Sequence, residues 1–168
     1  MSAAAEVLAG LASSGADDVA WLALADALEE QDDPRAEIVR LTTWLRRTVA
    51  HPDREAREER LRSLLAGGLR PLVPEMTVSH GLRLLLVPPG VFLMGAADGE
   101  EDAQPEESPR HEVEITRPFW LGVTHVTQAQ YEAIIGDNPS SFVPDSRLYT
   151  IPDKSTADYP VDGITHGM

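Results

Sequence analysis

The residues that could bind a cation are concentrated in one acidic segment, residues 96–109. Asp98, Glu100, Glu101 and Asp102 carry carboxylate oxygens, which are the ligands that Ca²⁺ prefers. Their spacing differs from that of an EF-hand loop, and vicinal carboxylates rarely converge on one ion. We therefore predict an exposed, solvated loop here, with a calcium site as the alternative.

The other residue types that commonly do chemistry form no recognisable group in this sequence. The histidines show no H-x₃-H spacing, and the chain contains no cysteine, which excludes disulfides and thiol catalysis within these residues. Asp26 and Glu29 or Glu30 share a helix, where a solvent-facing surface is the simplest interpretation. We therefore name no catalytic, cofactor-binding or metal-binding residue and predict no cofactor. The five histidines are His51, His80, His111, His125 and His166.

Charge and composition limit the kinds of partner. The 168 residues carry a formal net charge of −14, and 42% of them are hydrophobic, which is enough for a folded core. A surface this acidic repels nucleic acid and anionic membranes, because phosphate binding needs cationic side chains. No stretch is long and apolar enough to span a bilayer, and the N-terminus lacks the basic start of a signal peptide. These features predict a cytoplasmic protein with neither nucleic-acid nor membrane partners.

Four helices are predicted in the first 66 residues. The apolar positions recur at helical spacing in each of them, and breaks at Gly or Pro separate them. Pro34 and Pro52 suit helix starts, and Gly67-Gly68 suits a helix end. Residues 67–81 are rich in Gly and Pro and are predicted to be a linker. The expected helices cover residues 4–12, 18–30, a segment from Pro34 to about Val49, and a segment from Pro52 to Gly67.

Short strands and one helix are predicted after residue 81. The apolar run 82–87 and residues 91–95 are predicted to pair as a hairpin through Pro88-Pro89-Gly90. Residues 111–116 alternate between polar and apolar, which is typical of a half-buried strand. Thr127 and Gln130 have the spacing of a capping box, and Gly136 suits the C-terminal end, so residues 128–135 are predicted to form a helix. Residues 143–160 have no clear period and are predicted to be irregular.

The segment from Pro88 to Phe142 resembles the start of the formylglycine-generating enzyme (sulfatase-modifying factor) domain. The order and spacing of six short motifs carry the resemblance, which covers about half of the chain. His125 replaces a Glu that usually precedes Val-Thr, and His166 stands where the family usually has Trp. The six motifs are Pro88-Pro89-Gly90, Phe92 to Gly95, Pro109 to His111, Phe119 to Gly122, Val126 to Tyr131 and Gly136 to Phe142.

The resemblance implies a fold related to C-type lectins and, for the family's enzymes, oxidation of a substrate protein cysteine to formylglycine with oxygen and a copper ion held by two cysteines. His111 matches the histidine of a family motif, and we expect it to hydrogen-bond its own loop. Because this sequence has no cysteine, the copper chemistry cannot be assigned to any residue here.

Residues 21–41 resemble a second family, the short helical repeat-companion domain found at the N-terminus of many large bacterial proteins. The matching residues are Ala25 to Glu30, Asp33 to Arg35 and Glu37 to Leu41, with Asp32 where the family usually has Gly. The resemblance implies architecture and no chemistry. A docking module and a passive helical cap are both open readings of this segment.

The sequence therefore predicts an α+β protein with a helical domain at residues 1–66, a linker at 67–81, and a partial formylglycine-generating-enzyme-like domain with short antiparallel strands at 82–168. We expect a truncated or degenerate family member that is inactive as this chain. The alternative is a non-catalytic module that binds a protein or ligand. The expected partners are a protein bound by the N-terminal helices and a second copy of the chain joined through the incomplete sheet.

Overall fold

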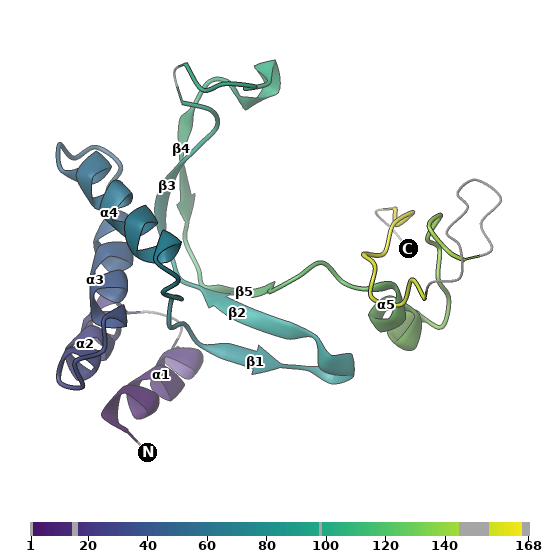
Figure 1. Ribbon diagram of the computed structural model, residues 1–168, viewed down its shortest axis with the longest axis horizontal. Helices are drawn as coiled ribbons and strands as arrows, with labels where there is room; N and C mark the ends of the chain where they lie inside the picture. The colour runs from purple at the N-terminus through teal and green to yellow at the C-terminus, as the bar shows by residue number, and fades with distance from the viewer. Residues whose placement is uncertain (1, 15–16, 98, 145–154, 166–168) are drawn as a thin grey trace. The chain divides into compact units, whose positions relative to one another are not determined.

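The computed structural model describes residues 2–14, 17–97, 99–144 and 155–165. Four helices occupy the first part of the chain, as predicted (Figure 1). Helix α3 begins after Pro34 and ends at Leu45, so Val49 lies outside it. The helices are α1 (Ala3–Ser14), α2 (Asp18–Glu29), α3 (Arg35–Leu45) and α4 (Arg54–Ala66).

The main hydrophobic core lies among the first three helices. Trp21, Leu24 and Leu28 are spaced along one face of α2 and are almost completely buried. Leu11 of α1 and Val39 of α3 belong to the same cluster. This is the arrangement expected when amphipathic helices bury their apolar stripes against one another. Helix α4 buries none of its residues, but two of its arginines contact α3: Arg54 Nη1 donates to the carbonyl oxygen of Leu45, and Arg60 Nε donates to Glu37 Oε1.

In the part of the chain that the structure describes, short strands form two separate arrangements, in which β1 pairs antiparallel with β2 and β3 pairs antiparallel with β4. Strand order in the three-stranded sheet is β1-β2-β5, and β3 pairs with β4 in a two-stranded ribbon. The predicted fold class is confirmed: helices combine with short antiparallel strands. The strands are β1 (Glu75–Thr77), β2 (Arg83–Val87), β3 (Gly90–Met94), β4 (His111–Ile115) and β5 (Phe119–Gly122).

The predicted hairpin between residues 82–87 and 91–95 is wrong. Strand β2 pairs with β1 and β5, so both of its edges are occupied, and β3 pairs with β4 instead. Pro88 and Pro89 have fixed φ angles and no N–H groups, and they lack the left-handed conformation that a two-residue hairpin turn requires. The segment Pro88-Pro89-Gly90 therefore links β2 to β3 without pairing them.

The segment 67–81, predicted as an irregular linker, contains strand β1 and a 3₁₀ turn at Ser79–Gly81. Glu75 to Thr77 pair with Leu85 to Arg83 of β2. Arg83 Nε donates to Glu75 Oε1 across the pair at 2.5 Å. The three residues of β1 are all exposed, so the strand lacks the alternation that reveals a half-buried strand in a sequence.

Helix α5 (Gln128–Ile135) begins and ends at the predicted residues. The amide of Gln130 donates to Thr127 Oγ1 at 3.2 Å, and the amide of Thr127 donates to Gln130 Oε1 at 3.0 Å. Gly136 has φ 86°, the left-handed value that glycine adopts without steric cost. The capping box and the C-terminal glycine are both confirmed.

Replacing Thr127 by alanine should therefore destabilise α5 by about 1 kcal/mol, because the amide of Gln130 loses its acceptor. Chemical denaturation, monitored through the NMR amide cross-peaks of α5, measures this change in the free energy of unfolding. Thr124→Ala, an exposed position three residues earlier, is the matched control and should change the free energy of unfolding by less than about 0.5 kcal/mol. Equal effects of the two substitutions would contradict the capping role.

Residue contacts divide the chain into two compact units. Unit 1 comprises Met1–Pro74 and Leu86–Phe119, and unit 2 comprises Glu75–Leu85 and Trp120–Met168. Helices α1 to α4 thus share one unit with the β3–β4 ribbon. In the described part of residues 143–160, the only ladder contact is an isolated bridge between Thr127 and Pro160, in keeping with the predicted irregular structure. Residues 145–154 lie outside the described residues.

No helix in the described part of the chain has the length and apolar character needed to cross a membrane.

Candidate functional site

The acidic loop is exposed, as predicted, at every residue that the structure describes there except Ala96, which is half-buried. Glu100 Oε2 accepts from the amide of Ala97 at 2.9 Å, so this carboxylate forms a hydrogen bond within its own loop. Asp98 lies outside the described residues. Among the residues that are described, no group of three or more His, Cys, Asp or Glu side chains could hold a metal ion. The two-cysteine copper site that the resemblance implies does not fit these residues, since the chain has no cysteine.

His111 begins β4 and contacts its own loop. Its Nδ1 lies 3.0 Å from the carbonyl oxygen of Pro109, which confirms the expected hydrogen bond within the loop. His51 packs edge-on against Trp44, with ring centroids 4.8 Å apart. His125 is exposed, and His166 lies outside the described residues. The histidines that are described are thus dispersed and form no common site.

Asp26 and Glu29 lie on the exposed face of α2, as predicted. Both accept from Arg40 Nη2 of α3, at 2.7 and 2.6 Å. All three side chains are largely solvated, so the pairs contribute little stability and no chemistry. Glu30 caps the C-terminal end of the same helix and is exposed.

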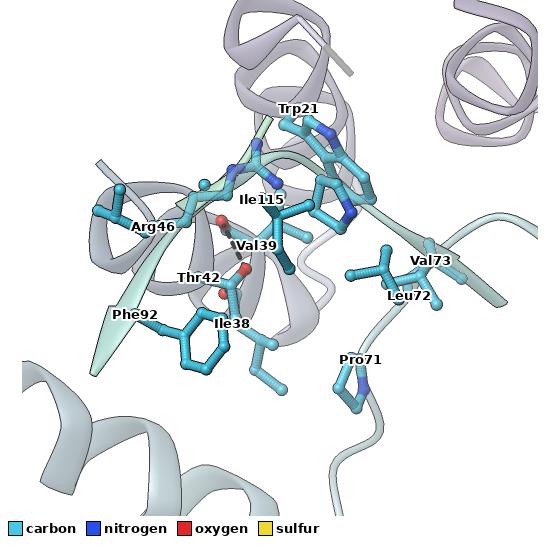
Figure 2. A pocket seen from close by; sticks show the side chains of 14 residues that line it. Trp21, Ile38, Val39, Thr42, Arg46, Pro71, Leu72, Val73, Phe92 and Ile115 are labelled. Atoms are coloured by element: carbon cyan, nitrogen blue, oxygen red, sulfur yellow. Dashed lines mark hydrogen bonds between the residues drawn. The ribbon is translucent and has the colours of Figure 1, made fainter. Parts of the chain in front are cut away.

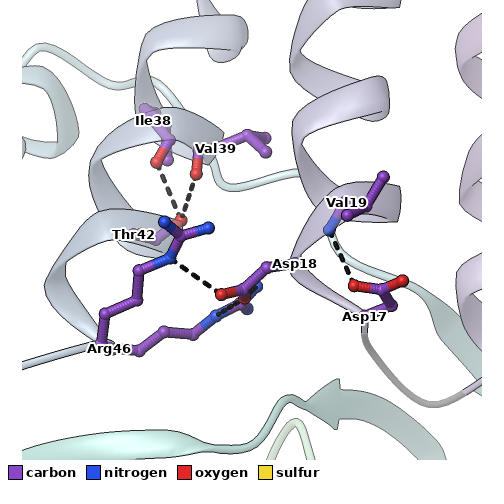
Figure 3. Close-up of polar contacts among 8 residues, drawn as sticks. Asp17, Asp18, Val19, Ile38, Val39, Thr42 and Arg46 are labelled. Carbon is purple, nitrogen blue, oxygen red and sulfur yellow. Dashed lines mark hydrogen bonds and ion pairs between the residues drawn. The ribbon is translucent and has the colours of Figure 1, made fainter.

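A charged cluster that the sequence analysis missed joins the start of α2 to the end of α3 (Figure 3). Arg46 Nη2 donates to Asp18 Oδ1 at 2.8 Å, and Arg47 Nε donates to Asp18 Oδ2 at the same distance. The guanidinium of Arg46 lies over the ring of Trp21, 5.0 Å from its centroid. Burial lowers the pKa of Arg46 from its usual value, although the hydrogen bond that Arg46 donates to Asp18 opposes the shift. The sequence feature that could have predicted this cluster is an Asp at the start of one helix and an Arg-Arg pair at the end of the next helix. Antiparallel packing of two consecutive helices brings these positions together.

The backbone of Arg46 also contacts the ribbon. The amide of Val91 donates to the carbonyl oxygen of Arg46 at 2.9 Å, which satisfies one acceptor that the end of α3 would otherwise leave free. Gly90 lies so close that a Cβ atom built there would be 2.5 Å from Arg46 Cβ. The glycine of the Pro88-Pro89-Gly90 motif is therefore where the ribbon meets the helices.

A partly open apolar pocket of about 290 Å³ lies beside this contact, within unit 1 (Figure 2). Side chains of α2, α3, the segment 71–73 and the ribbon surround it. Trp21 is buried among them, yet its Nε1–H has no acceptor among the described residues. The main lining side chains are Trp21, Ile38, Val39, Leu72, Phe92 and Ile115.

In unit 2, the matching motif residues form a buried hydrogen-bond network around Gln128. This side chain is 1% exposed. Its Nε2 donates to the carbonyl oxygen of Phe142 at 3.0 Å. Its Oε1 accepts from Asn138 Nδ2 at 3.1 Å and from Thr156 Oγ1 at 2.9 Å. One side chain thus joins α5 to two irregular segments.

A second set of contacts extends the network to residues 140–162. Both carboxylate oxygens of Asp162 accept from the amide of Ser141, at 3.1 and 3.2 Å. The amide of Asp162 donates to Ser140 Oγ at 3.2 Å. Asn138 Oδ1 accepts from the amide of Ser140 at 3.1 Å, the local turn predicted for this asparagine. The side chains of Asn138, Ser140 and Asp162 thus accept hydrogen bonds from backbone amides and stabilise the local backbone conformation.

Comparison with known proteins agrees with the motifs. A sequence model of the Sulfatase-modifying factor enzyme 1-like domain matches residues 70–166. A solved structure, PvdO from Pseudomonas aeruginosa, is similar at 26% sequence identity over 40% of this chain, with a TM-score of 0.36. The chain spans about a quarter of that protein, since the match covers 26% of its length. No curated protein sequence matches the chain.

The matched region begins before β1 and takes in every strand, α5 and the Gln128 network, and it excludes α1 to α4. The resemblance of residues 21–41 to the repeat-companion domain therefore stays a prediction. The match covers more than half of the 168 residues. Together with the six motifs, it establishes that the chain belongs to the family of the Sulfatase-modifying factor enzyme 1-like domain.

Proposed function

We propose that these 168 residues are a degenerate member of the family that does not oxidise a substrate cysteine by itself. One observation supports this most directly: the sequence contains no cysteine to supply the two thiolates that the family resemblance implies for copper. The polar residues of the matched motifs point the same way. Gln128 and Asn138 are occupied by internal hydrogen bonds and have a structural role.

The test is a turnover assay with the purified chain, copper, oxygen and a peptide that carries a sulfatase cysteine motif. We expect no aldehyde above that formed with copper and oxygen alone, as measured by mass spectrometry of the peptide. Peptide incubated with heat-denatured chain is the matched control. Catalytic aldehyde formation by the folded chain, with many turnovers per molecule, would overturn the proposal.

A second candidate function is that of a non-catalytic binding module that self-associates. The three-stranded sheet favours it, because β1 and β5 are its outer strands and carry exposed apolar side chains. Met76 is 37% exposed and Leu121 is 56% exposed. Outer strands of this kind can add strands from another chain unless charges or a cover prevent it.

Light scattering after size-exclusion chromatography should therefore show a mass that rises with protein concentration. Leu121→Lys, which adds a charge to β5, should shift the midpoint of association to at least several-fold higher concentration. Ala129→Lys, also exposed in unit 2 and outside the sheet, is the control and should leave the midpoint unchanged. A constant monomer mass at all concentrations would argue against this function.

The N-terminal helices are a further proposed protein-binding surface. Exposed side chains support this surface: Val19 of α2 is 70% exposed, and α4 buries none of its residues. A pulldown survey with wild-type chain and Val19→Glu as bait would test it. Recovery of the same proteins by both baits, or of none, would count against this surface.

A further inference from the structure

Helix α4 is attached to unit 1 in a different way from α2. Leu61 and Leu64 are the half-buried apolar residues of α4, and none of its residues is fully buried. Helix α2, by contrast, buries five residues, which include Trp21 and Leu24. Because the packing of an apolar face supplies most of the stability of a helix in a folded protein, α4 is held less firmly than α2.

Arginines of α4 make its polar contacts with α3 and with the turn that follows α3. Arg54 Nη1 donates to the carbonyl oxygens of Leu45 and Thr48, at 2.8 and 2.6 Å. These carbonyls lie at the C-terminal end of α3, where the helix itself supplies no donor. Arg60 Nε and Nη2 donate to the two carboxylate oxygens of Glu37, at 2.7 and 2.8 Å. Both side chains of this ion pair are about half exposed, so it contributes little stability.

A third arginine of α4 covers an aromatic ring of α3. The guanidinium of Arg57 lies over the ring of Trp44, 4.3 Å from its centroid. The ring of His51, in the segment between the two helices, packs edge-on against the same tryptophan. Arg57 Nε is buried and has no acceptor among the described residues. A buried donor without a partner carries a desolvation cost, which opposes the packing of α4 on α3.

The chain is fixed to the rest of unit 1 on both sides of α4. Before α4, Arg46 is paired with Asp18 of α2. After α4, Leu72 and Val73 pack against the main hydrophobic core. Gly68 lies between α4 and this second attachment, with φ 91° and no atom within 4 Å of a Cβ built there. Helix α4 can therefore leave α3 while α1, α2 and α3 stay packed together.

We propose that α4 is a cover that opens as one unit, more readily than the core of α1 to α3 unfolds, and so exposes Trp44 and the carbonyl groups at the end of α3. An isolated helix of this length is marginally stable in water, so α4 loses its helical hydrogen bonds when it leaves α3. The opening depends neither on cysteine oxidation nor on the outer strands of the sheet. It is therefore separate from both functions proposed above.

Native-state hydrogen exchange of the ¹⁵N-labelled full chain, measured by NMR, tests the proposal. We expect the amides of residues 58–66 in α4 to exchange at least about tenfold faster than those of residues 22–29 in α2, after correction for intrinsic rates. At urea concentrations below the unfolding transition, the amides of α4 should share one dependence on urea concentration. A shared dependence is the signature of a single cooperative opening.

Two arginine-to-alanine substitutions in α4 test what holds the cover closed. Arg54→Ala removes the hydrogen bonds to the end of α3 and should accelerate exchange in α4 at least about tenfold, with exchange in α2 unchanged. Arg62→Ala is the matched control, because Arg62 pairs with Glu58 and Glu59 of its own helix. Its effect on exchange in α4 should stay below about threefold.

Arg60→Ala is a milder variant that keeps the test valid if Arg54→Ala does not fold. It removes the ion pair with Glu37 and should accelerate exchange in α4 by about two- to fivefold.

Exchange in α4 as slow as in α2, or rates graded inward from the helix ends without a common urea dependence, would overturn the cover. Equal acceleration by Arg54→Ala and Arg62→Ala would overturn the role of the contacts with α3. If Arg54→Ala accelerated exchange in α2 as much as in α4, the two helices would open together, which would also overturn the proposal.

Discussion

Replacing Gly90 by alanine should lower the free energy of unfolding of unit 1 by about 3 kcal/mol, because the added methyl group has no room. Its Cβ would lie 2.5 Å from Arg46 Cβ and 2.9 Å from the carbonyl oxygen of Arg46. Neither atom is the end of a flexible side chain, so the ribbon must move away from α3. The hydrogen bond from the amide of Val91 to that carbonyl would then lengthen or break.

Urea denaturation monitored by circular dichroism measures the effect. Gly10→Ala is a sharp control, because Gly10 lies inside α1 and a Cβ there meets no atom within 4 Å. That change should stabilise the protein by about 0.5–1 kcal/mol, since alanine favours a helix interior. The same chemical change thus has opposite expected signs at the two glycines. A stability of Gly90→Ala equal to that of wild type would show that the ribbon does not pack against α3.

The second large expected effect is the loss of the Gln128 side chain. Gln128→Leu keeps a similar volume but removes the hydrogen bonds to Asn138, Thr156 and the carbonyl of Phe142. Each buried group left without a partner costs about 1–3 kcal/mol. Because some of these groups can relax toward water, we expect a total loss of about 3–4 kcal/mol, concentrated in unit 2.

Amide cross-peaks from residues 120–144, followed through a urea titration, report on unit 2 directly. Glu132→Leu makes a similar polar-to-apolar change at an exposed position of the same helix and should alter the free energy of unfolding by less than about 0.5 kcal/mol. If Gln128→Leu proved as stable as Glu132→Leu, the network would be dispensable. Retained stability in unit 1 would show that the effect is confined to unit 2.

The sequence indicates the family more directly than it indicates how the motif residues pack. Six motifs in order were sufficient to indicate the family, and the match at residues 70–166 agrees. The motifs did not reveal what their residues do. Gly90 is a contact point for α3, and Gln128, inside the Val126-to-Tyr131 motif, is the centre of a buried network. Residue type alone did not mark Gln128 as buried, since glutamine is usually exposed.

The sequence by itself determined the elements whose signals are local. Helix α5, with its cap at Thr127 and its end at Gly136, depends on hydrogen bonds and backbone angles within about ten residues. Strand β4 also has a local signal, because the exposed Glu112 and Glu114 alternate with the half-buried Val113 along the strand itself. Such signals need no knowledge of distant residues.

Only the tertiary structure decided which strands pair with β2 and which strand pairs with β3. It also decided that Trp21 lies beside an apolar pocket and that Asp18 contacts Arg46. A strand pairs with whichever neighbour offers a free edge and a matching face, and a run such as residues 82–87 is compatible with several neighbours. Arg46 meets Asp18 across 28 residues, and Thr156 meets Gln128 across the same separation. These contacts depend on how packed elements meet in space, and no local pattern encodes that.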